Sequence, residues 1–168
     1  IKTAGKKELN KVSSRYYDPA RLLPCAKATG ENILKQIRYF EEHDYDTKVM
    51  CILQGNNTDD YQRWFDQILK VIPKNEWERI GGVAFGTPMY GNGIMEDVER
   101  AYFIKSFEAP DYIKKHVHLL GVGSVSRLMP YIMFRRNGCI PDDVLLSFDS
   151  SKHTGGTIRG QYQLDFNM

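Results

Sequence analysis

Cysteine is scarce in this chain, and the cysteines are far apart. The 168 residues include three, Cys25, Cys51 and Cys139, an odd number without a Cys-x-x-Cys pair. This pattern provides neither a disulfide framework nor a recognised metal signature. Because disulfide-dense domains belong to oxidising compartments, the cysteine usage favours a reducing, cytoplasmic setting.

Long apolar runs and a strong excess of one charge are also missing. No segment reaches the roughly 18 apolar residues of a membrane span, and the polar start IKTAGKKELNK is not a secretory signal. We therefore expect no membrane partner. The formal net charge of +2 permits a nucleic-acid partner without arguing for one. The chain begins with Ile1 rather than Met, so we expect a fragment, a processed product or a truncated chain.

What is present is an alternation of short apolar runs and amphipathic segments. Residues 1–30 show little periodicity, and we interpret them as an irregular or helical N-terminal arm. Beyond them, strands are predicted at 48–53, 79–84, 117–120 and 144–148, and helices at 32–43, 58–71, 96–107 and 124–135. Strand starts are spaced by roughly 30 residues, the length of a βα unit. The pattern predicts an α/β fold with a parallel sheet, either open or half of a closed barrel, which needs about 250 residues.

Special residues mark each predicted strand near its end. They are Gln54-Gly55-Asn56, Gly81-Gly82 with Gly86, Gly121-Val122-Gly123-Ser124, and Asp149. Each has a structural explanation, because amides, carboxylates and glycines form turns and caps, and paired glycines allow close backbone packing. In parallel α/β folds, however, ligands bind at the carboxyl ends of the strands. Convergence of all four sites at that end therefore favours a binding site.

Two rival interpretations concern single motifs. His116 and His118 would share one strand face, and a His-x-His pair can ligate zinc. No third ligand lies at a recognised spacing, so we interpret both as structural residues and predict no metal site. The Gly-Val-Gly-Ser stretch at 121–124 resembles a phosphate cradle before a helix, which leaves a phosphate-binding α/β enzyme as another hypothesis.

Four stretches, CILQGNN, IGGVAFG, HLLGVGS and LLSFDSS, resemble in order the successive strand ends of the tRNA-guanine transglycosylase superfamily. This superfamily includes queuine and archaeosine tRNA-ribosyltransferases, and the resemblance covers about residues 30–155. It implies that residues 31–168 form the C-terminal half of a TIM (β/α)8 barrel. Such enzymes exchange guanine in nucleic acid for a 7-deazaguanine through a covalent aspartyl intermediate. FDSS is nearer to the archaeal-type pattern and to divergent members acting on DNA.

The resemblance also implies roles for particular residues. Asp149 matches the nucleophile that attacks the anomeric carbon, a step for which a carboxylate is suited. Gln54 matches the glutamine that hydrogen-bonds the base edge, since an amide offers both a donor and an acceptor. The remaining matches are residues whose backbone or apolar surface lies against the base: Gly82, Val83, Leu120 and Gly121.

Several parts of the family pattern are missing from the sequence. The C-terminal Cys/His zinc site is absent, so no cofactor is expected in this chain. The half that carries a second aspartate, the general acid/base, is also absent, so the chain alone should lack a complete active site. Expected partners are DNA or tRNA, a 7-deazaguanine base and a homo- or heterodimer partner. The alternative is a catalytically incomplete transglycosylase-like subunit that binds nucleic acid or a catalytic partner.

Overall fold

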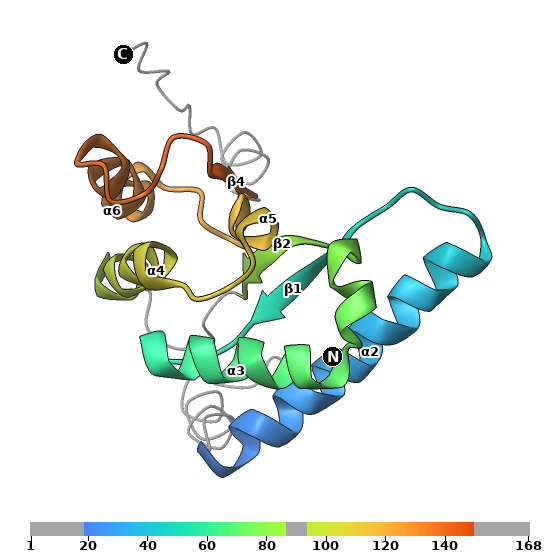
Figure 1. Ribbon diagram of the computed structural model, residues 1–168. Coiled ribbons are helices and arrows are strands. Elements are labelled where there is room, and N and C mark those ends of the chain that lie inside the picture. The colour runs from blue at the N-terminus through green and yellow to red at the C-terminus, as the bar shows by residue number, and fades with distance from the viewer. Residues whose placement is uncertain (1–18, 87–93, 150–168) are drawn as a thin grey trace, which may run out of the picture.

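One parallel sheet organises the chain, whose computed structural model describes residues 19–86 and 94–149 (Figure 1). Its strands are β1 (Val49–Leu53), β2 (Ile80–Phe85), β3 (His116–Leu119) and β4 (Leu145–Phe148), in the order β1-β2-β3-β4. All three neighbouring pairs are parallel, with helices in the intervening connections. The predicted α/β fold with parallel βα units is therefore confirmed.

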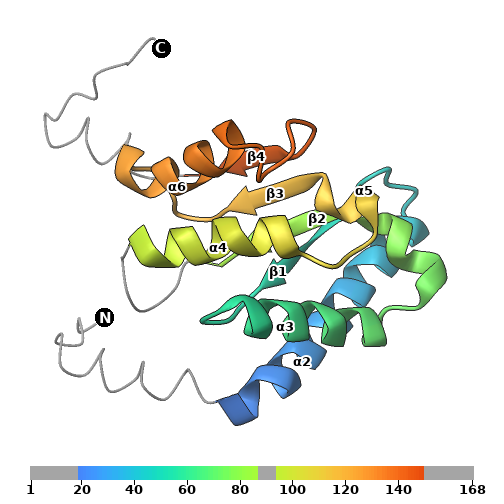
Figure 2. The same cartoon turned by 60° about the vertical axis from the view of Figure 1, so that its left-hand side comes forward.

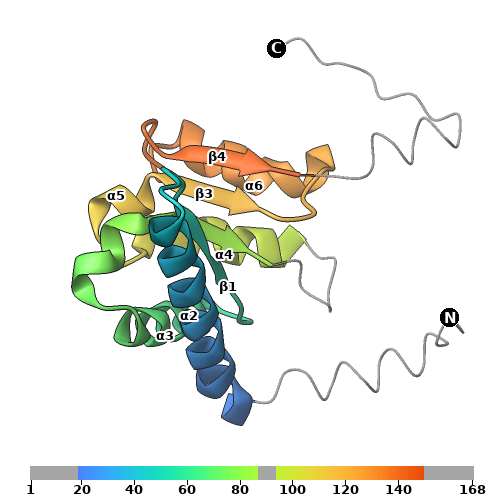
Figure 3. The ribbon, with the colours of Figure 1, turned by 90° about the vertical axis from the view of Figure 1, so that its right-hand side faces the viewer.

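Helices α3 (Thr58–Val71), α4 (Ile94–Ser106) and α6 (Val125–Arg136) lie side by side over one face of this sheet (Figure 2). The long helix α2 (Pro19–Glu42) crosses α3 and lies beside β1 (Figure 3). Two short helical segments, η1 (Lys74–Arg79) and α5 (Asp111–Lys114), precede β2 and β3. No helix in the described ranges combines the length and the apolar composition that a membrane crossing requires.

Helix α2 begins well before the segment predicted at 32–43. Residues 19–30 are helical and continue directly into that segment, while residues 1–18 of the predicted arm lie outside the described residues. The buried positions Leu22, Ala26, Ile33 and Ile37 follow helical spacing along its length. The early turns contain few large apolar residues and Pro24, which explains why their periodicity is weak in the sequence.

Helix α3 shows how local sequence sets the boundaries that frame the sheet. The Asn57 side chain caps its start by accepting a hydrogen bond of 2.9 Å from the Asp60 backbone N–H. The helix ends at Val71, just before Ile72 and Pro73 adopt extended backbone. Its buried face then packs on the sheet through aromatic and aliphatic side chains, namely Tyr61, Trp64, Phe65 and Ile68.

The two faces of the sheet differ because strand side chains alternate in direction. On β1, β2 and β3 the covered face, beneath α3, α4 and α6, consists of apolar residues that are at most 7% exposed: Val49, Cys51, Leu53, Val83, Phe85, Val117 and Leu119. On β4 the same face carries Leu146 and Phe148, and Phe148 is 51% exposed. The opposite face, here named the open face, carries Met50, Ile52, Ala84, His116, His118, Leu145 and Ser147. Ile52 is 43% exposed and Leu145 is 58% exposed, so these described helices do not cover this face.

Candidate functional site

The register of the sheet aligns the ends of all four strands. The last paired residues form one line across the sheet: Leu53, Phe85, Leu119 and Phe148. The residues that directly follow these four form a second line across the sheet, here named the strand-end row: Gln54, Gly86, Leu120 and Asp149. By alternation these positions belong to the open face. The structure thus brings three of the predicted site residues, Gln54, Leu120 and Asp149, to one edge.

Gln54 lies across the end of β2 because residue 86 has no side chain. A Cβ atom added to Gly86 would overlap the Gln54 amide, so any larger residue would displace that side chain. The Gly86 backbone N–H also donates to the Leu53 carbonyl at 3.3 Å, which keeps the two chain segments together beyond the sheet. The Gln54 amide is exposed and can therefore offer a donor and an acceptor to a ligand at this edge.

Asp149 is held at the edge through one of its two carboxylate oxygens. Its Oδ1 accepts a hydrogen bond of 2.6 Å from the Gly121 backbone N–H, a short charge-assisted contact. His118 Nε2 lies 3.8 Å from the same oxygen. The side chain is 60% exposed, and Oδ2 has no hydrogen bond to any residue that the structure describes. The carboxylate is thus oriented while one oxygen remains open to a ligand.

Gly121 provides the turn that makes this contact possible. Its φ of +68° lies in the left-handed region, where a residue with a Cβ is strained by roughly 1–2 kcal/mol. In this conformation its N–H donates to Asp149, and its carbonyl accepts a bond of 3.4 Å from Arg127 Nη1. The predicted role of Gly121, a close wall beside the base, thus coincides with a structural requirement for glycine.

Beneath the strand-end row lies a buried network of charged and polar side chains. Asp97, which is 0% exposed, accepts bonds of 2.7 and 3.1 Å from Arg127 and one of 3.1 Å from the Tyr131 hydroxyl. Burial is the main cause that raises the pKa of Tyr131, and the negative charge of Asp97 adds to it. The hydroxyl therefore remains a donor. Arg100, 1% exposed, lies 3.7 Å from Asp97 through Nη1.

The two arginines of this network reach the loops that follow β2 and β3. Arg100 Nη2 donates to the Gly86 carbonyl at 2.8 Å, and Arg127 donates to the Gly121 carbonyl. The network therefore fixes two positions of the strand-end edge from below. Sequence reasoning missed it, although a signal exists: Asp97 and Arg100 fall on the same helical stripe as the buried apolar residues Ala101 and Ile104.

His116 and His118 share one strand face, as the sequence predicts, and meet a common partner on β4. His116 Nε2 and His118 Nδ1 each lie 2.8 Å from the Ser147 hydroxyl oxygen. Burial, and then the neighbouring His118, lower the pKa of His116. No group of three or more His, Cys, Asp or Glu side chains suited to a metal ion occurs among residues 19–86 and 94–149.

Gly82 and Val83 lie away from the strand-end row, in the middle of β2. The Val83 side chain is fully buried on the covered face. Gly82 has φ +154°, and a Cβ atom there would overlap the His116 carbonyl oxygen of the neighbouring strand. Close packing of backbone, the structural alternative considered for this glycine pair, is therefore sufficient to explain Gly82.

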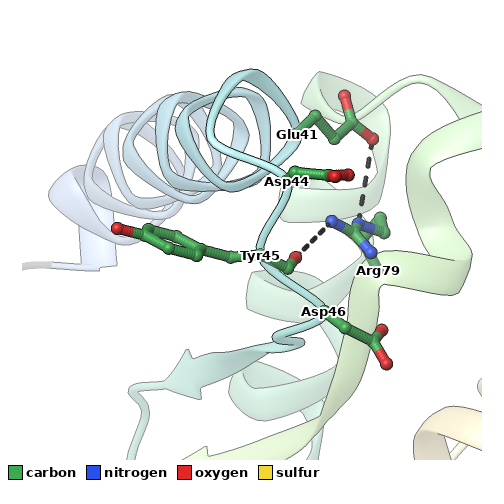
Figure 4. Close-up of a pocket in the computed structure, with 5 residues that line it drawn as sticks. All are labelled: Glu41, Asp44, Tyr45, Asp46 and Arg79. Carbon is green, nitrogen blue, oxygen red and sulfur yellow. Dashed lines mark hydrogen bonds and ion pairs between the residues drawn. The ribbon is translucent and has the colours of Figure 1, made fainter.

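Two shallow hollows border the sheet. One, of about 360 Å³, lies between α2 and the open face, where Phe40 and Gln36 approach Ile52, Ala84, His118 and Leu120. The other, of about 370 Å³, is lined by Glu41, Asp44, Tyr45, Asp46 and Arg79 (Figure 4). It sits before β1 and β2 begin, at the amino end of the sheet. Only the first hollow touches the strand-end row.

Comparison of the chain with protein-family models, with curated protein sequences and with solved structures finds no match. Function therefore rests on the geometry of the strand-end row. An oriented, exposed carboxylate next to an apolar residue can act as a nucleophile toward an electrophilic carbon of a bound ligand.

Proposed function

We propose that this chain is the C-terminal half of a TIM-barrel base-exchange transglycosylase. The enzyme would replace guanine in DNA or tRNA with a 7-deazaguanine through a covalent aspartyl intermediate. The observation that carries this proposal is the strand-end row, which aligns Gln54, Leu120 and Asp149 at the carboxyl edge of a parallel sheet. The four stretches that resemble the transglycosylase superfamily all lead into this edge.

The reaction begins at Asp149. Its Oδ2 attacks the anomeric carbon while the bond from that carbon to guanine breaks, and the bonding electron pair leaves with the base. Oδ1 stays anchored by the Gly121 N–H, so the carboxylate does not rotate away during attack. The incoming 7-deazaguanine nitrogen then attacks the same carbon, and the bond from that carbon to the aspartate breaks. The proton that this nitrogen loses balances the proton that the departing guanine takes up, and the general acid/base implied by the resemblance, outside this chain, would transfer both. A carboxylate suits both steps because it stabilises the oxocarbenium-like state and is a good leaving group.

The rest of the edge would recognise the base. Adjacent strands are roughly 4.8 Å apart, so the backbones at Gln54 and Asp149 are separated by roughly 14 Å across three strand spacings. This gap accommodates a flipped nucleotide, with the Gln54 amide reading the base edge and Leu120 packing on its face. The apolar hollow beside Ile52 and Ala84 extends the same surface.

The open face supports the half-barrel interpretation. In a closed (β/α)8 barrel, helices cover the outer side of the strands and the inner side is filled by side chains from all eight. Here α3, α4 and α6 lie over one side, while Ile52 and Leu145 are exposed on the other. Further strands would cover this inner side and bring the second aspartate of the family toward Asp149. The cysteines among the described residues are free, in keeping with a cytoplasmic enzyme.

The experiment that tests the proposal measures base exchange by the complete gene product. Guanine-containing DNA and tRNA are incubated separately with radiolabelled guanine, and denaturation-resistant protein–nucleic acid adducts are followed in parallel. We expect Asp149→Asn to abolish the adduct and to lower exchange by on the order of 10⁴-fold. Asp142→Asn is the matched control, because Asp142 is exposed in the loop before the same strand. Exchange by Asp149→Asn at the wild-type rate would refute the nucleophile.

The second candidate is a catalytically incomplete subunit that binds nucleic acid or a catalytic partner. It is favoured by one observation: among the described residues, no second carboxylate contacts Asp149. In that case the complete gene product alone would bind guanine-containing DNA or tRNA without exchange or adduct formation. Adding the partner would restore exchange, and Asp149→Asn in this chain would leave that restored rate unchanged.

A further inference from the structure

A continuous chain of polar side chains leads across the open face to the proposed nucleophile. His116 on β3 contacts the Ser147 hydroxyl on β4, and the same hydroxyl contacts His118 on β3, both at 2.8 Å. The other ring nitrogen of His118 lies 3.8 Å from Oδ1 of Asp149. All four residues belong to the same side of two paired strands, so the register of the sheet holds them together.

A hydroxyl has one hydrogen, which restricts how this chain can be protonated. Ser147 can donate to one histidine and must then accept from the other. In the first arrangement, Ser147 donates its hydrogen to Nδ1 of His118 and accepts a hydrogen bond from His116. A neutral His118 then carries its own hydrogen on Nε2, which faces Asp149. In the reverse arrangement, a lone pair on His118 Nε2 faces the carboxylate. An ionised Asp149 repels that lone pair and therefore selects the first arrangement.

Other charged groups near His118 do not supply a competing partner. His118 lines the hollow on the open face together with Lys48, whose ammonium group has no acceptor to offer an imidazole. Among the residues that the structure describes, Asp149 is the carboxylate in contact with His118. His116 faces Ser147 and His118, and burial favours its neutral form. Ser147 and Asp149 are thus the polar partners of His118 among the described residues.

We propose that His116, Ser147 and His118 form a hydrogen-bonded relay that positions the nucleophile Asp149, an inference that rests on the proposed function. The relay points the Nε2–H of His118 toward Oδ1 at 3.8 Å, an electrostatic contact longer than a hydrogen bond, while the Gly121 N–H donates the hydrogen bond to that oxygen. The hydrogen bond from Gly121 and the electrostatic attraction of the His118 N–H favour one rotation of the carboxylate, which leaves Oδ2 free for attack. His118 acts through Asp149, so it is a positioning residue for the reaction.

The first experiment needs no substrate and examines the relay alone. Nitrogen-15 NMR of the histidine rings reports which nitrogen carries hydrogen. At neutral pH we expect the Nε2–H form for His116 and His118, and a mixture of forms for His118 in Ser147→Ala. His43, whose ring lies 2.8 Å from the Tyr39 carbonyl at the far end of α2, serves as the internal control. An Nδ1–H form of His118 in the wild type would overturn the relay.

The second experiment measures adduct formation in His118 variants. A glutamine amide can place an N–H near the position of Nε2, whereas phenylalanine cannot. We expect His118→Phe to slow adduct formation by up to about 100-fold and His118→Gln to recover most of that loss. Recovery by glutamine but not by phenylalanine is a result that a purely structural role of this position would not give.

The two experiments separate failure of the relay from failure of the proposed function. If His118→Phe forms adduct at the wild-type rate while Asp149→Asn does not, the positioning role is wrong and the transglycosylase proposal stands. If the wild type forms no adduct but the NMR forms are as expected, the relay exists and the proposed function is wrong.

Discussion

The two faces of the sheet are made by the same four strands, yet they differ in almost every property. On the covered face, Leu53 and Cys51 are fully buried against α3 and its neighbours. One residue away on the same strand, Ile52 is 43% exposed. On the open face the neighbouring strands present histidine, serine and aspartate side chains. Strand alternation therefore allows packing and chemistry to occupy interleaved positions without competing for the same residues.

The largest expected effect comes from the charged network on the covered side. Asp97→Asn leaves Arg127 and Arg100 without their buried carboxylate, which should lower the free energy of unfolding by about 3–5 kcal/mol. Urea denaturation measures this loss. Asp66→Asn, at an exposed carboxylate on α3, is the matched control and should change stability by less than about 0.5 kcal/mol. Equal effects of the two substitutions would contradict a structural role for the network.

A direct comparison of the faces uses two adjacent residues of β1. Leu53→Ala removes a fully buried side chain and should lower the free energy of unfolding by about 2–5 kcal/mol. Ile52→Ala removes a similar side chain from the open face and should cost less than about 1 kcal/mol. Both values come from the same denaturation measurement. A loss at Ile52 as large as that at Leu53 would mean that the open face is covered in solution.

The smallest effect concerns Cys51 and pH. Burial raises the pKa of this thiol from 9.0 to about 12, so above pH 9 the unfolded chain loses the proton before the folded chain does. Stability contributed by the neutral thiol is complete below pH 9 and falls as the pH rises from 9 to 12. At pH 10 the loss should be about 1.4 kcal/mol.

The measurement for Cys51 is the slope of unfolding free energy against pH. Cys51→Ala should flatten that slope, although it also lowers stability at neutral pH. Cys25→Ala, at an exposed cysteine, should leave the slope unchanged. A wild-type slope identical to that of Cys51→Ala would show that the folded thiol titrates as freely as the unfolded one.

Much of the architecture follows from local sequence patterns, so most strands and helices can be predicted from the sequence. The four strands and the later helices were predicted within about two residues, because apolar runs, the Asn57 cap and Pro73 act locally. Because the carboxyl ends of parallel strands share one edge, the sequence also predicts Asp149 and Gln54 at that edge. The positions that depend on partners from other elements were not predictable in this way.

Asp97 and Arg100 illustrate that limit. In sequence they are charges on an amphipathic helix, and their burial depends on Arg127, Tyr131 and the Gly86 carbonyl, which the fold supplies. His118 was interpreted as a structural residue, because its distance to Asp149 depends on the register of β3 against β4. Gly82 shows the reverse case, in which a residue matched to a functional motif has a packing explanation in the structure.

The two backbone hydrogen bonds of Gly121 make its amide proton a useful probe of this edge. Its N–H is bonded to the Asp149 carboxylate and its carbonyl to Arg127, so one residue joins the exposed edge to the buried network. Hydrogen exchange at this amide requires release of Asp149 from the N–H. A single backbone proton would therefore report, without substrate, how often Asp149 leaves the position in which Gly121 holds it.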